Sequence, residues 1–252
     1  MSTSDDAPLS VWLRPEKPPR DRRLTRDRIV GRTVEILDSE GHRGLSMRRV
    51  ATDLGVTAGS LYWYVTTKDE LLELALDAVL GEVLADLRAA PVSGWREGLG
   101  HLARSTRAMM LRHPWVVSDL TAQPNLGPNA LALAETGLAV LSRAGFAERD
   151  LDAALAAVND QVTGAVAAEI TWRTVTARAA ARWPGEAGDF LAGLHRDHPH
   201  LARRMAAATG VDVDAECDRR FTFALDCLLD GLALRLAEGD GSDAPDGAPR
   251  ET

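Results

Sequence analysis

The residues best suited to bind a polyanion lie close together between positions 46 and 68 of the 252-residue chain. Arg48, Arg49 and Lys68 supply cations that can contact phosphate groups or the edges of bases. An aromatic run from Tyr62 to Tyr64 lies between them in the sequence. Since exposure to solvent alone gives no reason to place aromatic side chains between cations, this segment is a candidate nucleic-acid contact.

The capping and apolar residues of this segment predict two short helices joined by a tight turn. Ser46 and Thr57 can each accept a hydrogen bond from a free backbone N–H in the first turn of a helix. Gly55 can end the first helix, because glycine adopts the left-handed conformation without steric cost. Two apolar pairs with a spacing of four would pack the helices against each other: Val50 with Leu54, and Leu61 with Val65.

A helix-turn-helix places the start of its second helix against base edges in the major groove. Small residues at Ala58, Gly59 and Ser60 would let that helix lie deep in the groove. The Ala-x3-Gly-x5-Leu spacing by itself is also typical of an ordinary corner inside a helical bundle. The aromatic run and the neighbouring cations favour the DNA-binding interpretation.

Charge is distributed unevenly along the chain. Residues 10–56 hold 11 basic and 7 acidic side chains, a net charge of +4, whereas the whole chain has a formal net charge of −8. A basic segment on an acidic chain is expected of a protein that contacts DNA with one end only.

Residues from about 25 to 80 resemble the DNA-binding domain of the tetracycline-repressor (TetR) family of one-component regulators. The resemblance rests on the run from Gly55 to Val65 and on the segment Lys68-Asp69-Glu70-Leu71-Leu72. It implies that Arg48 reads a base from the first helix and that Lys68 holds a phosphate. The candidate contact residues on the recognition helix are Ala58, Gly59, Ser60, Tyr62, Trp63 and Tyr64.

The apolar periodicity of the chain is helical throughout, so the predicted fold class is all-α. We expect a three-helix DNA-binding head at residues 24–68 and a larger ligand-binding and dimerisation body at residues 69–238. The Pro-containing basic segment 1–23 is predicted to be a disordered arm, and the Gly-, Asp- and Pro-rich segment 239–252 a disordered tail. Helices are predicted at 25–39, ending before Gly41, and at 69–87, 95–112, 130–144, 150–183, 190–194, 201–208 and 217–238.

Several function classes have no support in the sequence. It contains no Walker-type phosphate loop, no dinucleotide-binding glycine fingerprint and no nucleophile elbow, so we do not expect an enzyme. No apolar run approaches the roughly 20 residues of a membrane span. Cys217 and Cys227 are too few for a disulfide framework, which suits a reducing cytoplasm. An effector-independent activator or architectural protein, and a helical enzyme, remain the alternative classes.

Aromatic and thioether side chains of the predicted body are candidates for the walls of an apolar ligand cavity, although such residues more often form an ordinary core. The candidates are Trp95, Met109, Met110, Trp115, Asn159 and Thr163. Members of the family that bind a drug–magnesium complex use histidines, and this chain has Leu84 and Asp119 at those positions. The resemblance therefore implies an effector bound without a metal or other cofactor.

A cluster of imidazoles from His195 to His200 is the only candidate for a metal site in the sequence. Pro199 interrupts the helical spacing that a pair of ligands would use, so a solvated loop is favoured.

In the family, two helices near the C-terminus pack against those of a second copy as a four-helix dimer interface. Segments 150–183 and 215–238 match those helices in length and order. The candidate interface residues are Ala157, Gly164, Phe221, Leu225, Leu228 and Leu232. The sequence thus predicts a homodimeric, ligand-responsive repressor that binds a palindromic double-stranded operator and is released by a small-molecule effector, with no membrane partner.

Overall fold

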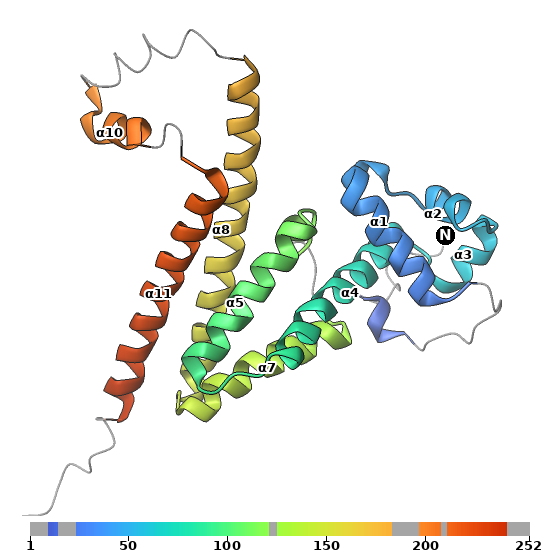
Figure 1. The fold of residues 1–252 in the computed structure, drawn as a ribbon. Helices are drawn as coiled ribbons and strands as arrows, with labels where there is room; N and C mark the ends of the chain where they lie inside the picture. Colours follow the sequence, from blue (N-terminus) through green and yellow to red (C-terminus); the bar gives the residue numbers. More distant parts are fainter. Residues whose placement is uncertain (1–9, 15–23, 121–124, 183–196, 208–210, 241–252) are drawn as a thin grey trace, which may run out of the picture.

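The computed structural model describes residues 10–14, 24–120, 125–182, 197–207 and 211–240. These residues form helices joined by short connections (Figure 1), and the all-α prediction is confirmed. The elements are the 3₁₀ helix η1 (Val11–Leu13) and the α-helices α1 (Arg26–Gly44), α2 (Met47–Asp53), α3 (Ala58–Tyr64), α4 (Lys68–Ala89), α5 (Trp95–Arg112), α6 (Val116–Asp119), α7 (Pro128–Ala144), α8 (Glu148–Arg182), α10 (Pro199–Ala207) and α11 (Val213–Asp240).

Helices α1, α2 and α3 form a head around one apolar core. Thr25 caps α1, because its hydroxyl accepts a hydrogen bond from the backbone N–H of Arg28 at 3.3 Å. Gly41, with φ of 64°, ends the regular part of α1 as predicted, and a further short helical segment reaches Gly44. The buried side chains of the head come from all three helices and the turns beside them: Leu24, Ile29, Ile36, Leu37, Leu45, Val50, Ala51, Leu61 and Val65.

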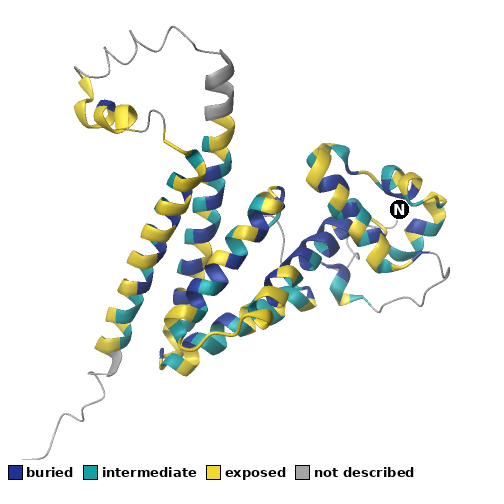
Figure 2. Cartoon of the chain, viewed as in Figure 1, coloured by how far each residue is buried: buried dark blue, intermediate teal, exposed yellow. Residues whose placement is uncertain are grey.

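Helix α4 is shared by the head and the body. It packs against α1 on one side of the molecule and against α5 and α7 on the other. Figure 2 shows that most of its length is buried, and its buried apolar residues extend from Leu71 to Leu84. A helix that is apolar on nearly every side is stable only when other helices enclose it.

The body consists of two layers beyond α4. Helices α5 and α7 pack against α4, and α8 packs against both of them. Helix α11 lies beside α8 at the edge of the molecule farthest from the head (Figure 1).

The predicted helix limits agree with the structure where a local signal marks them. Helix α5 spans the predicted 95–112, and α7 ends at Gly145, which has φ of 99°. Helix α11 begins at Val213, four residues before the prediction, because the carboxylate of Asp212 accepts hydrogen bonds from N–H groups in its first turn. The short helix α6 was not predicted, and the helix predicted at 190–194 lies outside the described residues.

Part of the predicted disordered arm has a defined position against α4, which corrects that prediction for residues 10–14. The hydroxyl of Ser10 and the N–H of Val11 donate to one carboxylate oxygen of Glu73, at 2.5 and 3.0 Å. The guanidinium of Arg26 lies 4.5 Å from the ring centre of Trp12. A prediction from composition could not show these partners, because Glu73 is more than 60 residues away in sequence. The other residues of the arm, and the tail after residue 240, lie outside the described residues.

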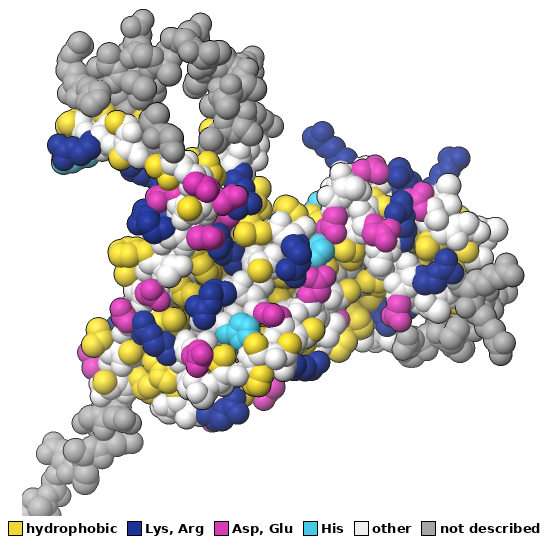
Figure 3. All heavy atoms as spheres, in the orientation of Figure 1, with side chains coloured by type: hydrophobic (Ala, Val, Ile, Leu, Met, Phe, Trp, Pro, Cys, Tyr) yellow, Lys and Arg dark blue, Asp and Glu magenta, His cyan; other side chains and the backbone are white. Residues whose placement is uncertain are grey.

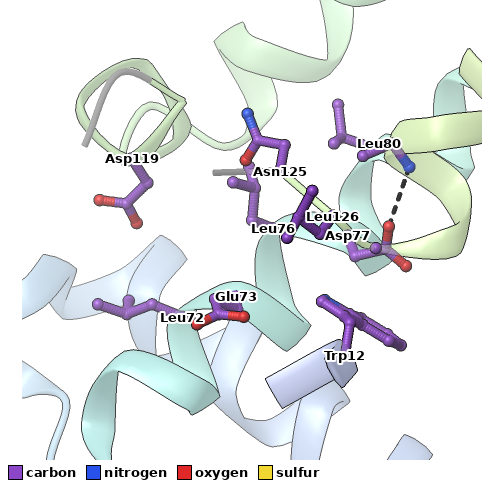
Figure 4. A pocket seen from close by; sticks show the side chains of 11 residues that line it. Trp12, Leu72, Glu73, Leu76, Asp77, Leu80, Asp119, Asn125 and Leu126 are labelled. Atoms are coloured by element: carbon purple, nitrogen blue, oxygen red, sulfur yellow. Dashed lines mark hydrogen bonds between the residues drawn. The ribbon is translucent and has the colours of Figure 1, made fainter. Parts of the chain in front are cut away.

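Asp77, a buried carboxylate on α4, caps helix α7. Its Oδ1 accepts hydrogen bonds from the backbone N–H groups of Asn129 and Ala130, both at 2.9 Å. Figure 4 shows one of these bonds as a dashed line at Asp77. Helix α7 has Gly127 as its N-cap and no side-chain cap of its own. A negative charge at the start of a helix also interacts favourably with the helix dipole. Asp77 therefore links α4 to α7 by polar bonds in addition to apolar packing.

We predict that Asp77→Ala lowers the free energy of unfolding by about 1–3 kcal/mol, because two buried N–H groups lose their acceptor. Asp77→Asn keeps an acceptor oxygen and should retain most of this stability. Urea unfolding followed by circular dichroism measures both variants. Equal losses in the two would show that the carboxylate charge matters and the hydrogen bonds do not.

Candidate nucleic-acid interface and ligand cavity

The turn between α2 and α3 has the geometry that the sequence predicted. The hydroxyl of Ser46 accepts from the N–H of Arg49 at 3.2 Å, and the hydroxyl of Thr57 accepts from the N–H of Ser60 at 3.2 Å. Gly55 follows α2 with φ of 68°. These caps fix the angle between two helices that share the apolar core of the head.

The first turn of α3 is open to solvent. Ala58 and Gly59 are exposed, and Ser60 is half-buried with its hydroxyl 2.9 Å from that of Thr57. Tyr62 leaves 47% of its surface exposed. Trp63 and Tyr64 are half-buried, and Tyr64 packs against the core. The small side chains and one exposed aromatic residue thus share the surface that a recognition helix presents to the major groove.

The carboxylate of Asp53 pairs with two arginines of the head. Its carboxylate accepts hydrogen bonds from the guanidinium groups of Arg32, at 2.5 Å, and Arg49, at 2.9 Å. These bonds, first that from Arg32 and then that from Arg49, lower the pKa of Asp53. The ion pairs of Asp53 with Arg32 and Arg49 therefore stabilise the folded head fully at pH values above the usual pKa of aspartate. This stabilisation is lost as the pH falls through the lowered pKa of Asp53.

Arg48, by contrast, is exposed on α2 and has no ion-pair partner among the described residues. Figure 3 shows Lys and Arg side chains projecting from the head. Sequence reasoning did not single out Asp53, although its position four residues after Arg49 is the usual spacing of a helical ion pair.

Lys68, the predicted phosphate contact, lies where the head meets the body. Its ammonium group donates a hydrogen bond to the backbone carbonyl of His42 at 2.8 Å. It therefore ties the end of α1 to the start of α4, and two of its three N–H donors remain for other partners.

Two histidines pair with carboxylates where the head meets the body. The Nε2 of His42, on α1, lies 2.8 Å from Asp119 on α6. The Nδ1 of His113, a buried residue after α5, lies 2.7 Å from Asp38 on α1. The indole N–H of Trp115 donates to the same Asp38 oxygen at 2.8 Å. Trp115, a predicted cavity residue, instead belongs to this junction, because its only polar atom is engaged there.

A small pocket adjoins the junction (Figure 4). It lies between Trp12, the face of α4 that carries Glu73 and Asp77, and the segment from Asn125 to Ala130. Its volume of about 20 Å³ suits a water molecule and not a drug-sized ligand.

A cavity of about 590 Å³, the size of a small-molecule site, lies at the far end of the body. Helices α5 and α7 form its walls together with the end of α4 and the connection that follows. Trp95, one of the predicted ligand residues, lines it. Sequence reasoning missed the other residues that matter here, among them His101 and Arg143, because helical spacing alone does not show which face of α7 meets α5.

The remaining predicted ligand residues lie elsewhere. Met109 and Met110 are fully buried in the core and line none of the cavities described above. Asn159 is exposed on α8, and Thr163 is half-buried on the same helix. The assignment of the two methionines to a cavity wall is therefore corrected to the core, since a side chain without accessible surface cannot contact a ligand in this conformation.

The four residues of α11 that were predicted for the dimer interface face the core of their own chain. Phe221 and Leu225 are 4% and 1% exposed within one protomer, so they pack inside the chain. Leu228 and Leu232 are half-buried against the same core. The apolar side chains that α11 exposes are instead Phe223 and Leu234, each 67% exposed. The assignment of Phe221 and Leu225 is therefore corrected to the core of the protomer, since the sequence pattern does not distinguish the inner face of a broad apolar helix from the outer one. The assignment of Leu228 and Leu232 stays a prediction.

On α8, Ala157 is half-buried and Gly164 is exposed. The described residues contain no group of three or more side chains that could hold a metal ion, and His195 lies outside them. No helix in the described part of the chain is long and apolar enough to cross a membrane.

The chain is similar to known regulators over both of its parts. Residues 29–75 match the family described as bacterial regulatory proteins, tetR family, and residues 89–236 match the tetracyclin repressor-like C-terminal domain. An HTH-type transcriptional regulator of Saccharopolyspora erythraea is 42% identical, with 84% of this chain and 97% of the relative covered. The HTH-type transcriptional repressor DrrR1 of Streptomyces coeruleorubidus is 36% identical, with 92% and 85% covered.

Solved structures show the same relationship. The crystal structure of ActR from Streptomyces coelicolor in complex with actinorhodin aligns with a TM-score of 0.63 and 30% identity, over 84% of this chain and 98% of that one. Apo ActR aligns with a TM-score of 0.67 and 28% identity, over 88% and 99%. With its helix-turn-helix head and its helical body both matched, the chain belongs to the TetR family of bacterial transcriptional regulators.

Proposed function

We propose that this regulator is a homodimeric repressor that binds a palindromic operator in the cytoplasm and leaves it when a small-molecule effector occupies the body. The observation that carries the proposal is the continuity of α4. One buried helix begins beside the recognition helix at Lys68 and ends at the wall of the 590 Å³ cavity.

Within the head, the base contacts are assigned to Arg48 and to the open face of α3 from Ala58 to Tyr64, with Lys68 near the phosphates. Arg48 suits this role because its guanidinium is unpaired among the described residues. Arginine donates two hydrogen bonds to guanine in the commonest specific contact.

The dimer is supported by the surfaces that α8 and α11 leave uncovered. Gly164 and Gly231 lie inside these helices, where glycine costs about 1 kcal/mol relative to alanine. A side chain at either position would meet no atom of the described protomer within 4 Å. A second copy that approaches closely explains glycine at these positions better than packing within the chain. The exposed Phe223 and Leu234 would supply the apolar contact area.

The effector is assigned to the cavity beside Trp95. ActR, a structural relative, was solved in complex with actinorhodin, so a related body can hold a small molecule. An effector can shift the equilibrium between two arrangements of the heads only by its difference in affinity for them. By linkage, operator DNA must then weaken effector binding by the same factor.

The proposal is tested by selecting an operator from a random duplex library with the purified protein and then titrating variants. We predict that Arg48→Ala weakens binding of the selected operator by about 1–3 kcal/mol and relaxes the preference at one base pair. Arg49→Ala is the matched control, since that guanidinium is held by Asp53 and Glu40. Failure to select any common sequence would contradict the operator proposal, and an equal effect of both substitutions would remove the role of Arg48.

We predict that Asp53→Asn strengthens binding to duplexes of random sequence, because it removes one of the two carboxylates that hold each of the guanidinium groups of Arg32 and Arg49. The plot of log affinity against log salt concentration should steepen by up to about 1.8, which corresponds to two additional phosphate contacts. Asp27→Asn removes the same charge from an exposed residue without an ion-pair partner among the described residues, and it should leave the slope almost unchanged. Fluorescence anisotropy measures both slopes, and identical slopes would contradict the prediction.

We predict that Phe223→Asp and Leu234→Asp each convert a dimer into a folded monomer. Both side chains are exposed in the protomer, so the fold should survive, whereas a carboxylate buried between two copies would lack a partner. Leu131→Asp is the control, because Leu131 is similarly exposed but belongs to α7, outside the two helices that would form the interface. Sedimentation velocity at micromolar concentration gives the assembly state. A monomeric wild type would overturn the dimer proposal.

A further inference from the structure

The charged side chains that line the 590 Å³ cavity are all basic or can become so. Of its lining residues, Arg143 and His101 are ionisable, and none is an aspartate or glutamate. Its other polar side chain is that of Thr136. The remainder of the lining is apolar. An uncharged apolar molecule would therefore bind without contacting the polar groups of Arg143, His101 and Thr136.

Arg143 offers donors that the protein leaves unused. Its Nε–H donates to the carbonyl of Ala139 on the same helix at 3.0 Å, which fixes the direction of the side chain. The described residues place no carboxylate in an ion pair with its guanidinium. The terminal N–H groups of the guanidinium therefore remain for an anion, and guanidinium groups bind carboxylates and similar oxyanions in a bidentate manner.

His101 is positioned by a carboxylate outside the cavity. Its Nε2 lies 3.2 Å from Asp86 on α4, and the hydroxyl of Ser105 also donates to Asp86. The hydrogen bond from Ser105, followed by that from His101, lowers the pKa of Asp86. The carboxylate of Asp86 accepts the N–H at Nε2, which fixes the orientation of the ring at the wall of the cavity.

The start of α5 adds a second positive feature. Helix α5 begins at Trp95 with Gly94 as N-cap, where φ is 88°, and it has no side-chain cap. Both residues line the cavity. The first N–H groups of an 18-residue helix thus carry their partial positive charge beside the cavity.

The walls favour a flat, apolar group. The indole of Trp95 packs edge-to-face on Phe146, with ring centres 5.8 Å apart, and so has a fixed orientation. Gly98 and Gly137 also line the cavity, and a Cβ on Gly98 would lie 3.3 Å from Val140. Helices α5 and α7 therefore meet closely at Gly98, and the indole of Trp95 offers the aromatic face in the lining of the cavity.

We propose that the cavity binds an aromatic molecule that carries an anionic group, with the rings against Trp95 and the anion held by Arg143. This inference rests on the proposed effector role of the cavity and specifies the chemical class of the effector. Arg143 is the specificity-determining residue, because it is the permanent charge at the site.

Two probes with the same ring system test the proposal. One is 8-anilino-1-naphthalenesulfonate, and the other is N-phenyl-1-naphthylamine, which lacks the sulfonate. The purified full-length protein should bind the sulfonate about tenfold more tightly, as measured by fluorescence titration. Arg143→Gln should remove this preference and leave the affinity for the uncharged probe unchanged. Arg149→Gln is the matched control, because Arg149 is highly exposed and does not line the cavity.

A cavity-filling variant identifies the binding site. Thr136→Phe places a ring inside the cavity and should abolish binding of both probes, while thermal unfolding confirms that the variant is folded. Equal binding of the two probes to the wild type, or an unchanged preference in Arg143→Gln, would overturn the anionic class and leave the effector cavity standing. Binding of neither probe, or binding unaffected by Thr136→Phe, would instead overturn the cavity as a ligand site.

Discussion

The burial of α4 between the head and the body is the constraint on which the rest of the structure depends. Its apolar residues from Leu71 to Leu84 are enclosed by α1 on one side and by α5 and α7 on the other. Because protein cores are close-packed, neither domain can move along or around this helix without repacking its own contacts with it. The polar bonds of Asp77 to the start of α7 and of Lys68 to the end of α1 fix the same helix at two points.

Electrostatic pairing decides which cations are available to partners. Asp53 holds Arg32 and Arg49 within the head, whereas Arg48 on the same helix as Arg49 remains exposed. In the body, Glu169 is buried and holds Arg107 at 2.9 Å, while Arg143 is left without a carboxylate among the described residues. An arginine without an internal partner is therefore more informative about binding than the total charge of the chain.

The helices of the head, and both ends of α5, could be predicted because the signals that define them are local. A capping hydroxyl at Ser46 or Thr57 and a glycine with positive φ at Gly55 act within a few residues of the helix end they mark. The start of α11 was not predicted correctly, because its cap, Asp212, lies before the first residue of the apolar periodicity.

The sites were harder to predict, because they join residues that are far apart in sequence. Asp38 meets His113 and Trp115 more than 70 residues later, and no periodicity reveals such a contact. The two faces of α11 were confused for a related reason. Both are apolar, and only the position of α8 shows that Phe221 is inside and Phe223 outside.

The length of α4 bears on how a small rotation of this helix would change the position of its far end. At 1.5 Å per residue its 22 residues span about 33 Å, with Leu87 at the wall of the cavity and Lys68 beside the recognition helix. When a rigid helix of this length rotates slightly about a point near its cavity end, its other end, beside the recognition helix, moves by a larger distance. In the proposed dimer, the two heads would move in opposite directions under such a tilt, and their separation would change by twice that displacement. In the proposed mechanism, an effector that shifts Leu87 by a fraction of an ångström would therefore change the distance between the two recognition helices, far from any atom it touches.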